Sequence, residues 1–323
     1  MKLRLTLALA SAVGAVLLPI WPANAAPGQS LAERLGYQAT DRLLIINGDD
    51  AGMCHAANAG TIESLEQGLM TTSTMMVPCP WFPALADYAR SHPGLDFGIH
   101  LTHTSEWKFY RWGPVALRDQ VPGLMDPNGC LWPSVEEVYA HATPEQALIE
   151  GRAQVRKALA AGVDVTHLDS HMGTLQYDAR YMEAYLKLAL EFDLPLRMAS
   201  QATLEKFQQP ALRARFAAQG IVFPDDFVYE ELKDESKDVK GFWLRVIRNL
   251  RPGVTELYIH AAKPTDELRA ITGSWKTRGE EFETFTHDAE VKQAVTEAGI
   301  IRIGYRPLRE LQRKERHGAR PSP

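Results

Sequence analysis

Short apolar runs alternate with stretches of helical periodicity along most of the chain. Strands that alternate with helices in this way usually form a parallel sheet, and strands buried on both faces are apolar throughout. We therefore predict an α/β fold, a parallel sheet or barrel in a single domain. The predicted strands lie at 42–48, 71–79, 96–102, 165–171, 194–200, 255–262 and 300–305, and the predicted helices at 55–68, 81–92, 143–162, 178–194, 203–220 and 286–299.

The helix over 143–162 has the clearest boundaries. Thr143 is a suitable N-cap, Pro144 suits the first helical position, Gln146 completes a capping box, and Gly162 ends the pattern. By contrast, residues 105–134 are rich in aromatics, proline and glycine and predict an extended loop region. Loops of this length inside a compact domain usually serve a function.

The two ends of the chain differ from the rest. Residues 1–25 combine two basic residues, an apolar stretch and a small-x-small ending at Ala25, which predicts a cleavable signal peptide and a periplasmic or secreted protein. An uncleaved anchor is the alternative. No later segment approaches the roughly 20 apolar residues of a membrane span, so we expect no stable membrane insertion. The predicted domain then covers 26–312, and 313–323 should form a disordered tail.

Composition excludes several classes of protein. The chain has 323 residues, 45% of them hydrophobic and 23% charged, which is typical of a globular protein. Its net charge of −5 and the lack of a basic block before the last residues argue against nucleic acid as a partner. Three cysteines, Cys54, Cys79 and Cys130, leave open whether any two form a disulfide. The oligomeric state is also open, with a homodimer as one alternative.

Polar side chains follow one predicted strand after another. In parallel α/β folds the carboxyl ends of the strands meet at one mouth, so we expect these side chains to converge. One carboxylate and two imidazoles form a common ligand set for a divalent metal ion. We predict Asp50, His100 and His171 as metal ligands. For each histidine taken alone, a surface or hydrogen-bonded core residue is the alternative.

Asp49 and Asp50 are adjacent, and neighbours on a strand normally point to opposite faces. Both can reach one site only if the chain leaves extended geometry there, which Gly48 and Gly52 would permit. We then expect Asp50 to bind the metal ion and Asp49 to stay free as a general base. The alternative is that one of them caps the following helix.

Other residues near these strand ends are candidates for supporting roles. A period of two places His167 and Asp169 on the face of His171, where either could orient that ligand by hydrogen bonding. His260 follows a strand and suits a proton donor. In the long loop, aromatic side chains could stack on sugar rings or merely pack the loop, and these are Trp107, Tyr110, Trp112 and Trp132.

With these residues identified, the sequence resembles the YdjC-like carbohydrate deacetylases, the family that includes chitooligosaccharide deacetylase. The matching stretches, in the family's order, are LLIINGDDAGM, GLMTTSTMMV, DFGIHLT, VTHLDSH, LPLRMAS and TELYIH. The resemblance implies a distorted (β/α) barrel, a magnesium or zinc ion, and hydrolysis of N-acetyl groups from amino sugars.

The resemblance also implies roles for particular residues. It matches Asp50, His100 and His171 to the metal ligands, Asp49 to the general base and His260 to the general acid. It places Arg197 where an arginine can orient the base. The segment after His171 and the loop after Thr102 depart from the family pattern, so the resemblance does not fix the sugar.

Two other functions are alternatives. The same cleft could belong to an exported carbohydrate-binding protein without turnover, although a binder has no need of an unligated carboxylate beside a ligating one. A metal-dependent esterase or phosphoesterase would keep the ion and change the bond. Such a site would favour more basic residues than Arg197 alone among the strand ends.

Overall fold

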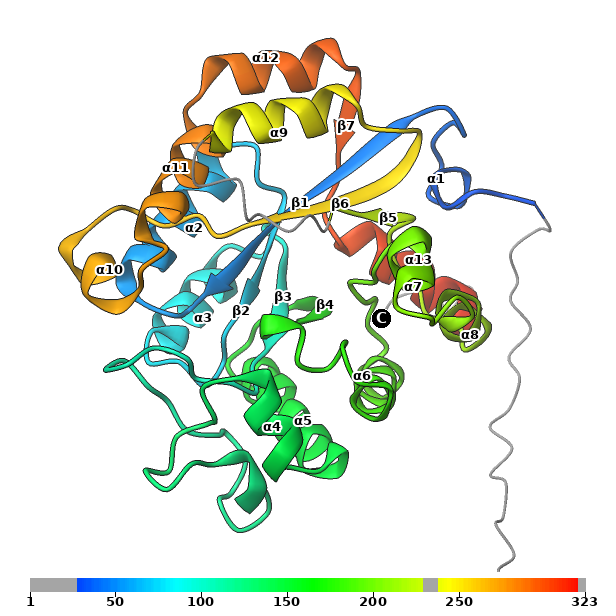
Figure 1. The fold of residues 1–323 in the computed structure, drawn as a ribbon. Coiled ribbons are helices and arrows are strands. Elements are labelled where there is room, and N and C mark those ends of the chain that lie inside the picture. Colours follow the sequence, from blue (N-terminus) through cyan, green and yellow to red (C-terminus); the bar gives the residue numbers. More distant parts are fainter. Residues whose placement is uncertain (1–27, 229–237, 319–323) are drawn as a thin grey trace, which may run out of the picture.

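The protein is described by a computed structural model that covers residues 28–228 and 238–318 (Figure 1). The predicted signal peptide, 1–25, lies outside the described residues. Within the described residues, seven strands form one parallel sheet in the order β4-β3-β2-β1-β6-β5, with β7 also paired to β1. The strands are β1 (Arg42–Ala51), β2 (Thr72–Met75), β3 (Phe97–Leu101), β4 (Val165–Ser170), β5 (Asp226–Phe227), β6 (Gly253–Ile259) and β7 (Ile300–Arg302).

Strand β1 is the centre of the sheet. It pairs with β6 over Arg42–Gly48, while its other edge pairs first with β7 and then with β2. Its apolar run is buried on both faces: Leu44 and Ile46 join one hydrophobic cluster, and Leu43 and Ile45 join another. The continuous apolar pattern of this segment therefore reflects burial on two sides, as expected for a central parallel strand.

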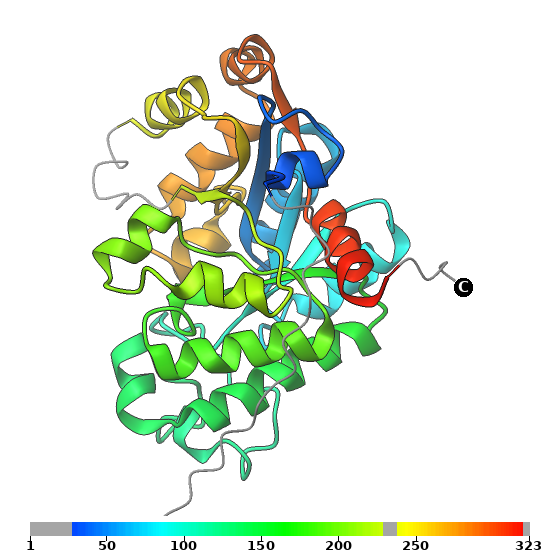
Figure 2. The same ribbon diagram turned by 90° about the vertical axis from the view of Figure 1, so that its right-hand side faces the viewer.

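Helices surround the curled sheet, which confirms the predicted distorted (β/α) barrel in a single domain. Figure 2 shows α5 and α6 below the sheet and α13 at its side. The larger helices are α2 (His55–Gln67), α3 (Phe82–Ser91), α5 (Pro144–Ala160), α6 (Ala179–Phe192), α9 (Val239–Arg248), α11 (Trp275–Thr286), α12 (Ala289–Glu297) and α13 (Arg306–His317). The shorter ones are α1 (Leu31–Arg34), α4 (Val135–His141), α7 (Gln201–Lys206), α8 (Leu212–Ala218) and α10 (Asp266–Ile271).

Helix α5 starts as its sequence predicts, with one difference. The Thr143 side chain accepts a hydrogen bond from the backbone N–H of Gln146, as an N-cap should. The Gln146 side chain does not return the bond, because its Oε1 instead accepts from the backbone N–H of Gly123 at 2.8 Å. The Gln146 side chain therefore connects the long loop region to α5 and does not complete the predicted capping box.

Three predicted elements are wrong in part, and two helices were not predicted at all. The strand over 194–200 is reduced to a single bridge between Leu168 and Leu196, because Pro195 has no N–H to donate to a ladder. The helix over 203–220 is two helices, α7 and α8, separated where Gln208 adopts a left-handed φ of 58°. Helices α10 and α11 were not predicted. The predicted tail from Arg313 begins inside α13, which continues to His317.

Among the described residues, we find no helix that combines the length and the apolar character needed to cross a bilayer.

Candidate metal centre

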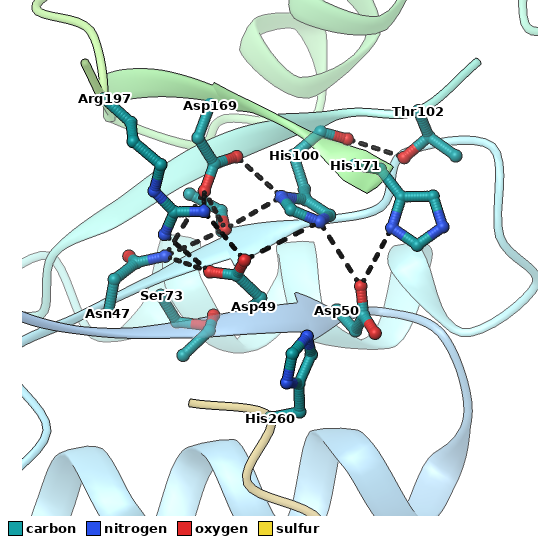
Figure 3. Close-up of polar contacts among 12 residues, drawn as sticks. Asn47, Asp49, Asp50, Ser73, His100, Thr102, Asp169, His171, Arg197 and His260 are labelled. Carbon is teal, nitrogen blue, oxygen red and sulfur yellow. Dashed lines mark hydrogen bonds and ion pairs between the residues drawn. The ribbon is translucent and has the colours of Figure 1, made fainter. Parts of the chain in front are cut away.

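The carboxyl ends of β1, β3 and β4 bring the three predicted ligands together (Figure 3). Asp50 Oδ1 lies 3.3 Å from His100 Nε2 and 3.2 Å from His171 Nδ1. These ligand atoms all lie within 4.8 Å of one another, and all three side chains are buried. Residues that are far apart in the sequence thus converge on one point.

A break in β1 lets both aspartates face this point. Asp50 adopts a left-handed φ of 64°, and the register of β1 with β2 shifts between Gly48 and Ala51. Gly52 has a φ of 86°, whereas Gly48 is not in the left-handed region, so Gly52 and Asp50 itself make the turn. The N-cap of α2 is Cys54, so the alternative that an aspartate caps this helix is wrong.

Three features of the site suit a cation. Asp50 Oδ1 is buried and accepts no hydrogen bond, although it faces two imidazole nitrogens. Burial lowers the pKa of His100 and of His171, but the surrounding carboxylates outweigh burial and raise these pKa values to about 10 and about 9. The site therefore stabilises positive charge, and one carboxylate with two imidazoles is a donor set that suits zinc and similar divalent ions.

Asp169 supports His100 from behind. Its Oδ1 lies 2.6 Å from His100 Nδ1, an arrangement that leaves Nε2 directed at Asp50. Asp169 was expected to orient His171, so the sequence identified the residue and not its partner. The prediction for His167 is wrong: its ring stacks on Tyr305 with centroids 3.7 Å apart, and its Nδ1 lies 3.0 Å from Thr166 Oγ1.

Arg197 holds the predicted general base. Its two terminal nitrogens donate to the two oxygens of Asp49 at 2.7 and 2.8 Å, and its Nε donates to Glu256 at 2.8 Å. Burial raises the pKa of Asp49, but Arg197 and His100 outweigh burial and lower it to about 2. Asp49 is therefore an ionised, oriented carboxylate whose Oδ2 lies 4.0 Å from His100 Nε2.

A second group of potential ligands, Asp49, His100 and Asp169, also lies close together. Both carboxylates of this group already contact the Arg197 guanidinium, Asp169 at 3.1 Å. A fixed positive charge at this position disfavours a metal ion there, so the point between Asp50, His100 and His171 is the better cation site.

His260 directly follows the last residue of β6. It faces Asp49 and Asp50 from the side opposite His100 and His171 (Figure 3). Its side chain is 28% exposed and lines the cleft. Its backbone N–H donates to the buried carboxylate of Glu281 at 2.7 Å, which fixes the segment that carries it. The structure thus places His260 at the mouth of the site and outside the ligand group.

Two charged residues of the site were missed. Arg278 donates to Asp50 Oδ2 at 2.6 Å, which leaves Oδ1 directed at the histidines. Glu106 lies 3.1 Å from His171 Nε2. Arg278 belongs to the unpredicted helix α11, and Glu106 belongs to the long loop. The only sequence signal was that an acidic residue lies in a loop expected to serve a function.

The aromatic residues of the loop mostly pack against one another. Trp112 is buried, and its indole N–H donates to Thr104 O, so the prediction that it stacks on sugar is wrong. The Trp107 and Tyr110 rings lie 5.3 and 6.3 Å from the Trp112 ring. Trp132 donates to Gly123 O. In the described part of the chain none of the four lines the cleft, which favours the packing alternative.

The cysteines take no part in this site. In the described residues, which include all three, Cys54, Cys79 and Cys130 are free thiols. Burial is the main reason that the pKa of Cys54 is raised to about 11, so this thiol stays protonated.

The fold and the site define a class of protein: a parallel (β/α) barrel with an Asp-His-His cluster at the carboxyl ends of its strands. The family described as YdjC-like protein matches residues 43–297. This match covers most of the chain, and the chain therefore belongs to the YdjC-like family.

Similar sequences and a similar solved structure are consistent with this family. A carbohydrate deacetylase of Thermus thermophilus is 31% identical over 83% of this chain and 94% of its own length. One from Enterococcus faecalis is 30% identical over 83% of this chain and 99% of its own. A solved structure from Enterococcus faecalis, named as a proposed cellobiose-phosphate cleavage protein, is 28% identical, with a TM-score of 0.72 over 83% of this chain and 99% of that chain.

Proposed function

We propose that this protein is an exported, metal-dependent hydrolase that removes N-acetyl groups from a carbohydrate that contains an amino sugar. One observation carries the proposal: Asp50, His100 and His171 converge on a single point beside the ionised Asp49, inside a cleft of about 670 Å³. The names of the relatives support a carbohydrate as the substrate and an acetyl group as the group that is removed.

An amide is a poor electrophile with a poor leaving group, so its hydrolysis requires activation of the carbonyl carbon and protonation of the leaving nitrogen. A divalent ion, when bound by Asp50, His100 and His171, would supply a Lewis acid that polarises the acetyl carbonyl and acidifies water. Asp49 accepts the proton of the attacking water, and Arg197 keeps its carboxylate ionised and aimed into the cleft. His260, at the mouth, donates a proton to the departing amine, a step typically worth about 10²–10⁴-fold.

Acetate release from a panel of N-acetylated glycans tests this proposal. We expect the wild-type protein to release acetate, and we expect chelation and Asp49→Asn each to abolish the release. Tight glycan binding by the wild type without turnover would instead support a binding protein. Full activity of Asp49→Asn would remove this residue as the base.

Export is a separate part of the proposal and is supported by the pattern of residues 1–25. Expression of the full chain in a bacterial host, followed by N-terminal sequencing, tests it. We expect a mature chain that begins near Ala26 outside the cytoplasm. An intact N-terminus in the cytoplasmic fraction would contradict export without affecting the proposed chemistry.

A further inference from the structure

A second cavity lies beside the catalytic cleft. Its volume is about 270 Å³, and it is formed by the start of α6, by α7 and by β5. Gln176, Tyr177 and Phe227 line both this cavity and the cleft. The cavity and the cleft are therefore adjacent and share part of one wall.

The two spaces differ in chemistry. The cleft is lined by the ionisable groups of the candidate metal centre, whereas no charged side chain is among the described residues that line the second cavity. Its wall is mainly apolar and includes Met182, Met198, Leu204 and Phe207.

Two polar side chains of the cavity wall, those of Gln176 and Thr203, already have partners within the protein. Gln176 Nε2 donates to Arg197 O at 3.3 Å, and Thr203 Oγ1 lies 2.9 Å from Ser200 Oγ. A sugar ring placed there would leave most of its hydroxyl groups without partners, which costs free energy on burial. An apolar group has no such cost, so the wall favours an apolar occupant over a second sugar.

Large apolar side chains also gather at the rim. Tyr177 and Phe207 are 49% and 54% exposed, and their ring centroids lie 6.5 Å apart. Exposed apolar groups of this size beside a pocket are typical of binding sites. An apolar cavity of about 150 Å³ can bind benzene, so the present one has room for a somewhat larger group.

We propose that this cavity binds an apolar substituent, an alkyl chain or an aromatic ring, that the substrate carries next to its N-acetylated sugar. The inference rests on the proposed deacetylase function and narrows its substrate class to amphiphilic glycosides.

A series of alkyl N-acetylglucosaminides tests the inference: methyl, butyl, hexyl and octyl, each below its micelle concentration, with N,N′-diacetylchitobiose as the sugar-only comparison. The kcat/KM for acetate release should rise about threefold to fourfold for each methylene that enters the cavity, and the octyl compound should exceed the methyl compound by about tenfold or more. Equal values along the series, or a preference for the disaccharide over the octyl compound, would overturn the cavity proposal and leave the deacetylase intact.

Substitution at the rim shows whether the cavity causes the effect. Phe207→Asp should bring the ratio of octyl to methyl kcat/KM close to one, whereas Phe207→Leu should retain most of it. Phe109→Asp is the matched control, because Phe109 is 87% exposed and, among the described residues, lines neither space. A ratio that is unchanged in Phe207→Asp would overturn the assignment to this cavity.

Binding measurements distinguish failure of the cavity proposal from failure of the proposed deacetylase function. If the wild type releases no acetate from any glycoside, binding of the octyl compound is measured by calorimetry. Binding that Phe207→Asp abolishes and Phe109→Asp preserves would support the cavity as an apolar site. Absence of binding by the wild type would overturn it.

Discussion

Arg197 is the counter-charge for a cluster of three buried carboxylates. One guanidinium contacts three carboxylates, those of Asp49, Asp169 and Glu256, and all four side chains are buried. Burial raises the pKa of Glu256 to about 7, even though Arg197 and Tyr305 oppose the rise. Asp49, in contrast, remains ionised, and Arg197 makes the largest contribution to keeping its pKa low.

Replacing Arg197 therefore tests the network. Arg197→Gln leaves buried carboxylates without a counter-charge, so we expect the free energy of unfolding to fall by about 3–5 kcal/mol. Glu256→Gln is the control: it keeps the shape of a side chain that is near neutrality at pH 7, so the loss should be about 1 kcal/mol. Urea denaturation measures both. A loss below about 1 kcal/mol in Arg197→Gln would show that Arg197 does not stabilise these carboxylates.

The sequence identified Asp50, His100 and His171 because each ends a strand, and parallel strands end at one edge of a sheet. Arg278 could not be predicted in the same way. It reaches Asp50 from α11, and the position of that helix depends on tertiary packing.

At the scale of elements, long segments with a clear apolar or periodic pattern were predictable, whereas short or weakly patterned segments were not. β1 and α5 follow their patterns closely. The segment 194–200 has the composition of a strand but forms a single bridge, because Pro195 has no N–H to donate to a ladder. Helix α11 was missed because its pattern is weakly amphipathic, with polar side chains such as Glu281 and Arg278 buried in the site.

Gly98 sets how closely β3 and β4 approach. A Cβ at this position would lie 2.5 Å from the His167 ring and 2.7 Å from its backbone oxygen. We expect Gly98→Ala to destabilise the protein by about 1–3 kcal/mol through overpacking and to disturb the contact between His100 and Asp169. Gly94→Ala, with open space around its Cβ, should be near neutral. Thermal unfolding of both variants checks this, and equal melting temperatures would contradict it.

Helix α13 is held to the start of β4 by charge. Arg306 and Arg309 both contact Asp164. Burial raises the pKa of Asp164, but these two arginines outweigh burial and lower it below its ordinary value.

Because the folded pKa of Asp164 is depressed, its contribution to stability is present above the unfolded pKa of about 3.9 and is lost as the pH falls through the folded pKa. Asp164 is partly exposed, so we expect Asp164→Asn to cost about 1 kcal/mol or less at pH 7. The difference from wild type should shrink as the pH falls below about 3.9, so it should be smaller at about pH 3 than at pH 7. Urea unfolding at both pH values measures it, and a difference that grows with acid would refute the ion-pair explanation.

For the whole molecule, the candidate metal centre links three strands, since its ligands come from the ends of β1, β3 and β4. A cation that binds only the folded state should therefore stabilise the entire domain. At a free concentration of about 100 times its Kd, the expected gain is about 2.7 kcal/mol. Zinc or magnesium titration followed by thermal unfolding tests this, with Asp50→Asn expected to lose the gain. An equal shift in Asp50→Asn would place the cation elsewhere.

The central claim is that Asp50, His100 and His171 bind one divalent ion, and anomalous diffraction from a crystal grown with zinc tests it most directly. The account predicts a single strong peak about 2.0–2.2 Å from Asp50 Oδ1, His100 Nε2 and His171 Nδ1. A crystal with these three side chains ordered and no peak between them would contradict the account.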